Sequence, residues 1–126
     1  MKLKNFVFVL SAALLFGCAS PSQFTRLTPL QQSRNPNNVY PVEVKFESTD
    51  QSMRHDTLKG FVEVNGQLYP LHPMPLVQNR WEGFVPVMPG SGEVEFRFKF
   101  TYLYNAFGSQ PKSGSTVSPT YKLRVE

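Results

Sequence analysis

Residues 93–104 alternate between apolar and polar side chains, and this alternation constrains the fold more than any other stretch of the sequence. One parity carries Val94, Phe96, Phe98, Phe100, Tyr102 and Tyr104. The other carries four charged residues together with Thr101 and Leu103. A period of two is typical of a β-strand with one buried and one wet face, whereas a helix would spread the aromatic rings around its circumference. The stretch therefore predicts a strand whose apolar face is covered by a second layer.

This predicted strand is unusually long. Twelve residues would span about 40 Å, roughly twice the common strand length. We expect the strand to bend, or its end beyond Phe100 to leave the sheet as one arm of a hairpin.

The same alternation predicts five further strands, over residues 39–48, 57–64, 67–71, 80–88 and 120–126. Asn65-Gly66 is the strongest hairpin signal in the chain, because a type I′ turn needs positive φ at both positions. Residues 89–92 form a turn by their composition. The remaining segments, 49–56 and 105–119, are predicted to be loops.

Six or seven short strands without a helical pattern indicate an all-β fold. Their number and spacing over residues 39–126 resemble an immunoglobulin-like antiparallel β-sandwich. No pair of cysteines brackets Trp81, so the resemblance is to the disulfide-free members of that fold.

The first eighteen residues have the layout of a secretory signal, with Lys2 and Lys4 ahead of an apolar run over 6–16. Leu15-Phe16-Gly17-Cys18 resembles the lipobox of bacterial lipoproteins, although Phe16 stands where that family has a small residue. The resemblance implies that the chain is cleaved before Cys18 and that this cysteine carries acyl chains, so that membrane lipid is a partner.

Cys18 is the only cysteine of the chain, so the domain that follows has no disulfide, thiol nucleophile or thiolate metal site. Several acyl chains give stable anchoring. Ala19 and Ser20 follow the cysteine, and the absence of Asp there implies, by the same resemblance, the outer membrane of the cell envelope.

Residues 19–38 are rich in Ser, Pro, Gln and Asn without a consistent period, which predicts a flexible tether. The sequence leaves an alternative open. Phe24, Leu27 and Leu30 could instead form one helical turn or pack onto the domain.

Charge and motifs exclude several classes of function. Removing Lys2 and Lys4 reduces the thirteen basic residues to eleven, against nine acidic ones, and no basic stripe suited to nucleic acid remains. His55 and His72 lie in polar or proline-rich stretches without a nucleophile motif or a cluster of metal ligands. We therefore expect no enzyme activity, no metal and no cofactor.

Paired carboxylates are the other arrangement that could support catalysis, as in glycosidases. Glu93 with Glu95, and Glu43 with Glu47, fall on outward strand positions, so we expect them to form ion pairs with basic neighbours.

Aromatic side chains are the remaining candidates for a ligand or partner surface. They are Trp81, Tyr102, Tyr104, Phe107, Phe61 and Phe84, the last two on outward parities. Aromatic rings offer apolar area and, in Trp and Tyr, a polar edge. The run from Trp81 through Gly90 to Lys99 is weakly similar to glycogen- and starch-binding modules, although a core position for Trp81 is the competing interpretation.

Two functions are consistent with these observations. The first is a membrane-anchored, non-enzymatic structural or protein-interaction module that binds an envelope protein. The alternative is a carbohydrate-binding module that displays its aromatic face to polysaccharide.

Overall fold

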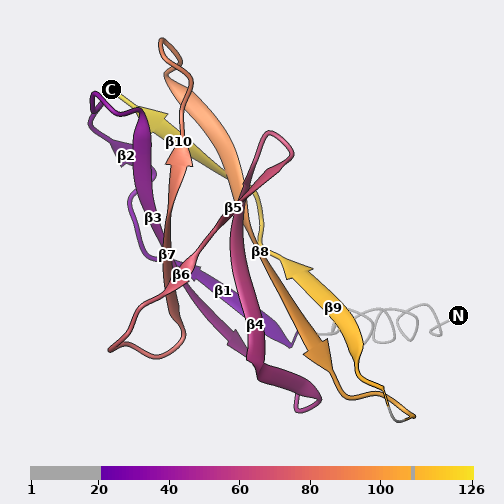
Figure 1. Cartoon of the computed structure of the whole chain (residues 1–126). Coiled ribbons are helices and arrows are strands. Elements are labelled where there is room, and N and C mark those ends of the chain that lie inside the picture. Colours follow the sequence, from indigo (N-terminus) through magenta and orange to yellow (C-terminus); the bar gives the residue numbers. More distant parts are fainter. Residues whose placement is uncertain (1–20, 109) are drawn as a thin grey trace, which may run out of the picture.

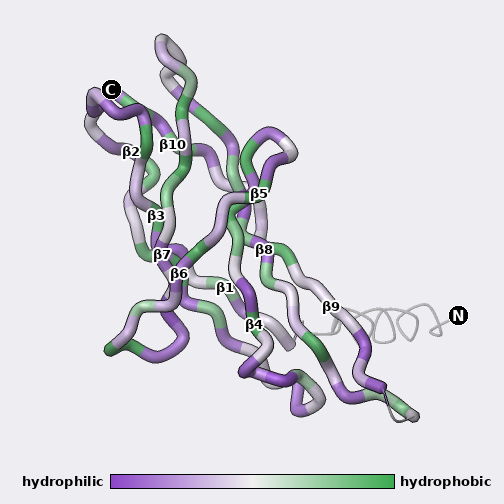
Figure 2. Tube along the Cα trace, viewed as in Figure 1, coloured by the Kyte–Doolittle hydropathy of each residue, from purple (hydrophilic) through white to green (hydrophobic). Residues whose placement is uncertain are grey.

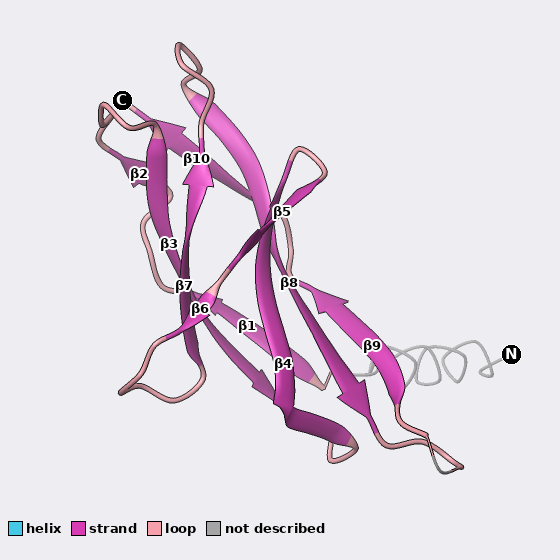
Figure 3. Ribbon diagram, viewed as in Figure 1, coloured by secondary structure: helices cyan, strands magenta, loops and turns pink. Residues whose placement is uncertain are grey.

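The computed structural model describes residues 21–108 and 110–126, and the segment 1–18 predicted as a lipoprotein signal, with Cys18, lies outside these residues. The described residues contain no helix and form ten strands (Figure 3). The strands are β1 (Ser22–Arg26), β2 (Gln31–Gln32), β3 (Val39–Ser48), β4 (Met53–Val64), β5 (Gln67–Pro70), β6 (His72–Pro73), β7 (Arg80–Pro86), β8 (Glu93–Tyr104), β9 (Lys112–Val117) and β10 (Tyr121–Val125).

The strands form two sheets packed face to face (Figure 1). One sheet has the order β1-β3-β7-β6, and the other has the order β2-β10-β8-β4-β5 with β9 also paired to β8. All pairs are antiparallel except β2 with β10. An immunoglobulin domain places its first, second, fifth and fourth strands in one sheet and the others in the second sheet. When β2, β5 and β9 are set aside as additional strands, β1, β3, β7 and β6 are the first, second, fifth and fourth of the remaining seven. The chain therefore has the strand order of an immunoglobulin-like sandwich, as predicted, with ten strands in place of six or seven.

The core lies between the two sheets and consists of the inward parity of β3, β4, β7, β8 and β10. Figure 2 shows this alternation as apolar and polar residues taking turns along the strands. The largest fully buried side chains are Tyr40, Phe98, Phe100, Leu123, Val42, Val44, Val62 and Val85. At the β4–β5 turn, Asn65 and Gly66 have φ values of 51° and 79°, as the predicted type I′ hairpin requires.

An aromatic cluster joins the sheets near one end of the core. The ring of Phe46 on β3 stacks on that of Phe100 on β8, with centroids 4.2 Å apart and planes at 8°. Trp81 on β7 meets Phe100 edge-on at 5.2 Å, and Phe24 on β1 lies 5.1 Å from Phe46. Four strands from both sheets thus contribute rings to one cluster.

Beyond Phe100, β8 forms one arm of a hairpin with β9, but the expectation that this end leaves the sheet is wrong, because its other edge stays paired with β4. From Lys99 to Tyr104 it pairs with β9, so the predicted 105–119 loop is wrong over residues 112–117. On the other side, β4 begins at Met53, four residues before the predicted strand, and its register to β8 shifts between Arg54 and Lys59. The hydroxyl of Thr57 spans this irregularity: it accepts from the N–H of Leu103 (2.9 Å) and donates to the carbonyl of Arg54 (2.6 Å).

The prediction of a flexible tether over 19–38 is wrong for the described residues 21–38. β1 pairs with β3 over five residues, from Ser22 opposite Ser48 to Arg26 opposite Val44. β2 pairs with β10. The physical reason is that β3 offers an open edge to which β1 adds a ladder, while Phe24 inserts its ring into the aromatic cluster. The alternative that this segment packs onto the domain is the correct one.

A short interruption separates β9 from β10 along the same edge of β8. Ser118 is buried, its hydroxyl accepts from the N–H of Phe98 (2.8 Å), and it donates to the carbonyl of Pro119 (2.8 Å). Pro119 has no N–H to offer to the ladder. The serine hydroxyl takes the place of a backbone carbonyl as the acceptor for the N–H of Phe98, while the N–H of Ser118 donates to the carbonyl of Phe98 (2.9 Å).

The sandwich has two distinct ends. The N-terminal pole contains Pro21 and the loops after β3, β6 and β8, in the lower part of Figure 1. Backbone hydrogen bonds hold it together: Thr49 donates to Pro21 (2.9 Å) and Asn105 donates to Ser52 (2.8 Å). The C-terminal pole contains the Asn65-Gly66 turn, the 89–92 turn and the C-terminus.

Replacing Phe24 tests whether the N-terminal segment is part of the fold. Because the ring is half-buried against Phe46, we expect Phe24→Ala to lower the free energy of unfolding by about 2 kcal/mol. Chemical denaturation followed by Trp81 fluorescence measures this. The matched control is Gln23→Ala, an exposed neighbour on the same strand. Equal stability of the two variants would instead support a tether.

Replacing Ser118 tests the bridge between β9 and β10. Ser118→Ala leaves the N–H of Phe98 without an acceptor, so we expect a loss of about 1–3 kcal/mol of unfolding free energy. Ser115→Ala, at an exposed position of β9, is the control and should change stability by no more than about 0.5 kcal/mol. A Ser118→Ala variant as stable as this control would contradict the assigned role of the hydroxyl.

Candidate functional site

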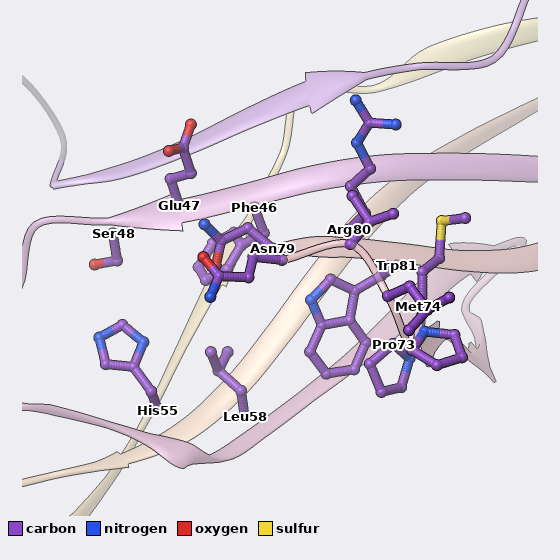
Figure 4. A pocket seen from close by; sticks show the side chains of 14 residues that line it. Phe46, Glu47, Ser48, His55, Leu58, Pro73, Met74, Asn79, Arg80 and Trp81 are labelled. Carbon is purple, nitrogen blue, oxygen red and sulfur yellow. The ribbon is translucent and has the colours of Figure 1, made fainter.

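A hollow lies at the N-terminal pole, between the end of β3, the start of β4 and the segment 73–81. Its volume is about 660 Å³, within the range of small-molecule sites. The walls include Trp81, Leu58 and Pro73, with Ser48 and His55 on the opposite side (Figure 4). The hollow thus combines an aromatic wall with polar groups.

Trp81 has its place here because β7 begins at Arg80 and turns the indole to the inner parity. Pro73 of β6 lies directly opposite Trp81 in the strand pairing. The indole meets Phe100 edge-on, is half-buried and packs against the core. One side of the ring therefore packs on the core and another lines the hollow, and the role of Trp81 in binding a ligand stays a prediction.

Not all polar side chains that line this hollow point into it. His55 and Ser48 face the hollow from β4 and β3 (Figure 4). The guanidinium of Arg80 points away from the indole, and its Nη1 lies 3.9 Å from Oε1 of Glu43. The charge of Arg80 is thus directed to the outer face of the sheet and not into the hollow.

The two tyrosines of the arm do not form a flat platform. Tyr102 and Tyr104 have ring centroids 6.4 Å apart and planes inclined at 60°. Tyr102 covers Gly114 of β9, where an added Cβ would come within 2.8 Å of the ring. Burial, with a smaller contribution from the charge of Asp50, raises the pKa of the Tyr102 hydroxyl above its ordinary value. Because its ring packs over Gly114, Tyr102 helps to hold β8 and β9 together.

The remaining predicted aromatics lie far apart in the fold. Phe61 is half-buried on the outer face of the β4–β8 sheet, and Phe84 is 57% exposed on the outer face of the other sheet. Phe107 is fully exposed in the loop after β8. The six residues predicted as a ligand or partner surface do not come together in a single surface.

The outer face of β3 and β7 carries an apolar patch, of which the prediction from the sequence contained only one residue. In the register of these strands Pro41 lies opposite Phe84, and Val39 opposite Pro86. Val39, Phe84 and nearby Met88 are 38%, 57% and 72% exposed. We call these five residues the β3–β7 patch. Only Phe84 could be recognised from its outward parity, because the patch depends on the strand register.

A second hollow, of about 540 Å³, adjoins this patch at the C-terminal pole. Val39, Pro86 and Met88 line it together with Tyr69. The β3–β7 patch therefore continues around the edge of the sandwich.

The two histidines, which were considered as possible catalytic residues, lie at different places in the fold. His72 lies opposite Glu82 on exposed strand positions, and His55 is at the other hollow. Within residues 21–108 and 110–126 no three His, Cys, Asp or Glu side chains group as metal ligands. Nor does this part of the chain contain a helix long and apolar enough to cross a membrane.

The carboxylates named from the sequence have basic neighbours. Glu47 lies 3.5 Å from Lys45, and Glu93 lies 3.9 Å from Lys122. Glu95 lies opposite Lys122 in the strand pairing. Arg97, on the same strand as Glu93, pairs instead with Glu63 at 3.2 Å.

Asp50 has another role. The hydrogen bonds from the hydroxyl (2.7 Å) and the N–H (2.9 Å) of Ser52 lower the pKa of its carboxyl. Asp50 therefore orders the turn between β3 and β4.

Comparison with known proteins found no family model, no curated protein and no solved structure that matches the chain. The function is therefore argued from the surfaces and hollows themselves.

Proposed function

We propose that the protein is a lipid-anchored protein of the cell envelope, attached through acylated Cys18, whose sandwich binds a protein partner without catalysis. Support for the anchor comes from the sequence Leu15-Phe16-Gly17-Cys18 after an apolar segment. The outer membrane is its proposed location.

The single observation that supports the interaction role is the β3–β7 patch. Soluble domains rarely leave contiguous apolar surface in water, and such surface often marks an interaction site. Here two opposed pairs of apolar side chains, together with Met88, lie on the outer face of a sheet that no other layer of residues 21–108 and 110–126 covers. A partner that covers Phe84 would remove apolar area from water, which favours association.

Replacing Cys18 tests the anchor. We expect Cys18→Ser, expressed in a diderm bacterium, to lose the added mass of the acyl chains and to move from the membrane to the soluble fraction. Intact-mass measurement and fractionation check this. An unmodified wild-type chain in the soluble fraction would contradict the proposal.

Photocrosslinking tests the patch. A photoreactive phenylalanine analogue in place of Phe84 should give a discrete protein adduct in cells. The same analogue in place of Thr25, exposed on the outer face of the same sheet, should not. No adduct at position 84, or the same adducts at both positions, would count against a partner on the patch.

The hollow beside Trp81 favours carbohydrate binding as a second candidate function, because it combines an indole wall with polar groups. Trp81 is the only tryptophan, so its emission reports directly on this hollow. Oligosaccharides that bind there should change the emission and retard the protein in polysaccharide gels, and His55→Ala should weaken both effects. Unchanged emission across a broad glycan panel would exclude this function.

A further inference from the structure

The inference concerns the N-terminal pole and rests on the proposed acylation of Cys18. Only Ala19 and Ser20 separate Cys18 from Pro21. Pro21 is held to the sandwich, because its carbonyl accepts a hydrogen bond from the N–H of Thr49 (2.9 Å). Three residues reach at most about 11 Å when fully extended. An acylated Cys18 would therefore keep this pole close to the lipid surface.

Two apolar side chains at this pole are almost completely exposed and could enter a lipid layer. Leu76, in the loop after β6, is 96% exposed, and Phe107, in the loop after β8, is 105% exposed. Figure 2 shows these two loops with apolar tips, one on each side of the hydrophilic loop after β3. Single exposed apolar residues are common on protein surfaces. These two differ because they lie at the pole that the anchor would bring to the membrane.

Two hydrogen bonds of Asn105 fix the base of the loop that carries Phe107. Asn105 donates its N–H to the carbonyl of Ser52 (2.8 Å), and its side-chain oxygen accepts from Nε of Arg54 (2.9 Å). The base of the loop is thus fixed to the neighbouring β3–β4 turn. A fixed base reduces the conformational entropy lost when the tip enters another phase.

Charge at this pole is nearly balanced. Arg54 and Lys112 are offset by Asp50 and Asp56. Attraction to anionic lipid therefore contributes little, and burial of apolar side chains is the driving force for contact with the membrane.

We propose that the protein rests on the membrane with its N-terminal pole, and that Leu76 and Phe107 insert into the interfacial layer of the bilayer that holds the acyl chains. The two tips and the anchor give three points of contact, and three points fix the tilt of the sandwich. The C-terminal pole and its apolar hollow then face away from the lipid.

The test supplies the tether chemically, so that it does not depend on acylation in the cell. All ten strands lie within residues 22–125, so a chain of residues 18–126 contains the whole sandwich. Its Cys18 thiol is coupled to a maleimide-headgroup lipid in phosphatidylethanolamine–phosphatidylglycerol vesicles. In a Trp81→Phe background, Phe107→Trp or Leu76→Trp places a single indole at a tip, and Phe84→Trp is the matched control.

We expect the emission of both tip variants to shift to the blue and to be quenched by lipids with brominated acyl chains, while the Phe84→Trp control stays unquenched. Quenching should not change with ionic strength or when the anionic lipid is replaced by a neutral one. Tip emission equal to that of the control would overturn the proposal, as would quenching lost at physiological salt.

Hydrogen exchange gives a second measurement that needs no substitution and so does not depend on the folding of any variant. Coupling to vesicles should slow exchange in residues 74–79 and 105–108 relative to the 65–66 and 89–92 turns. Equal slowing, or none, overturns the proposal. The mass of the chain made in cells reports acylation separately, so failure of the anchor and failure of membrane insertion can be told apart.

Discussion

The stacked rings of Phe46 and Phe100 are the contact on which the sandwich depends. They lie on β3 and β8, which occupy the two places in the strand order that antibody domains join by a disulfide. With Cys18 as its only cysteine, this chain has no such bond available. Stacked pairs contribute about 0.5–1.5 kcal/mol beyond the burial of their area. The edge strand β1 and the inner strand β7 join the same contact through Phe24 and Trp81, so one cluster secures strands of both sheets.

Much of the fold could be predicted from the sequence because burial on one face leaves a period of two, as in Glu93–Tyr104, and because Asn65-Gly66 has few conformations other than its turn. Four strands were missed, β1, β2, β6 and β9, and the two longest of them, β1 and β9, lack this signal. β1 has one large apolar side chain, Phe24, and β9 has none before Val117. β1 is held by the ladder to β3, and β9 by the ladder to β8 and by the ring of Tyr102 over Gly114. Such pairing energy comes from the partner strand and cannot be seen in the segment itself.

The candidate site was less predictable than the fold, for a geometric reason. Parity tells whether a side chain points in or out, and it did so for Trp81, Phe84 and Phe61. It does not tell which sheet a strand joins, so Phe61 and Phe84 were grouped although they lie on opposite faces. The β3–β7 patch needs the register that places Pro41 beside Phe84. The hollow beside Trp81 needs β3, β4 and the 73–81 segment to meet at one end of the sandwich.

The antiparallel pairing of β1 with β3 has a mechanical consequence. β1 leaves the N-terminal pole at Ser22 and runs beside β3 for its whole length. A pull on residue 21, resisted by a partner bound at the far end of β3 and β7, acts along the strand axis. The hydrogen bonds of the ladder would then be loaded together, in shear, instead of opening one after another. A domain tethered at this end resists unfolding under a pulling force more strongly than a domain whose first strand can separate one hydrogen bond at a time.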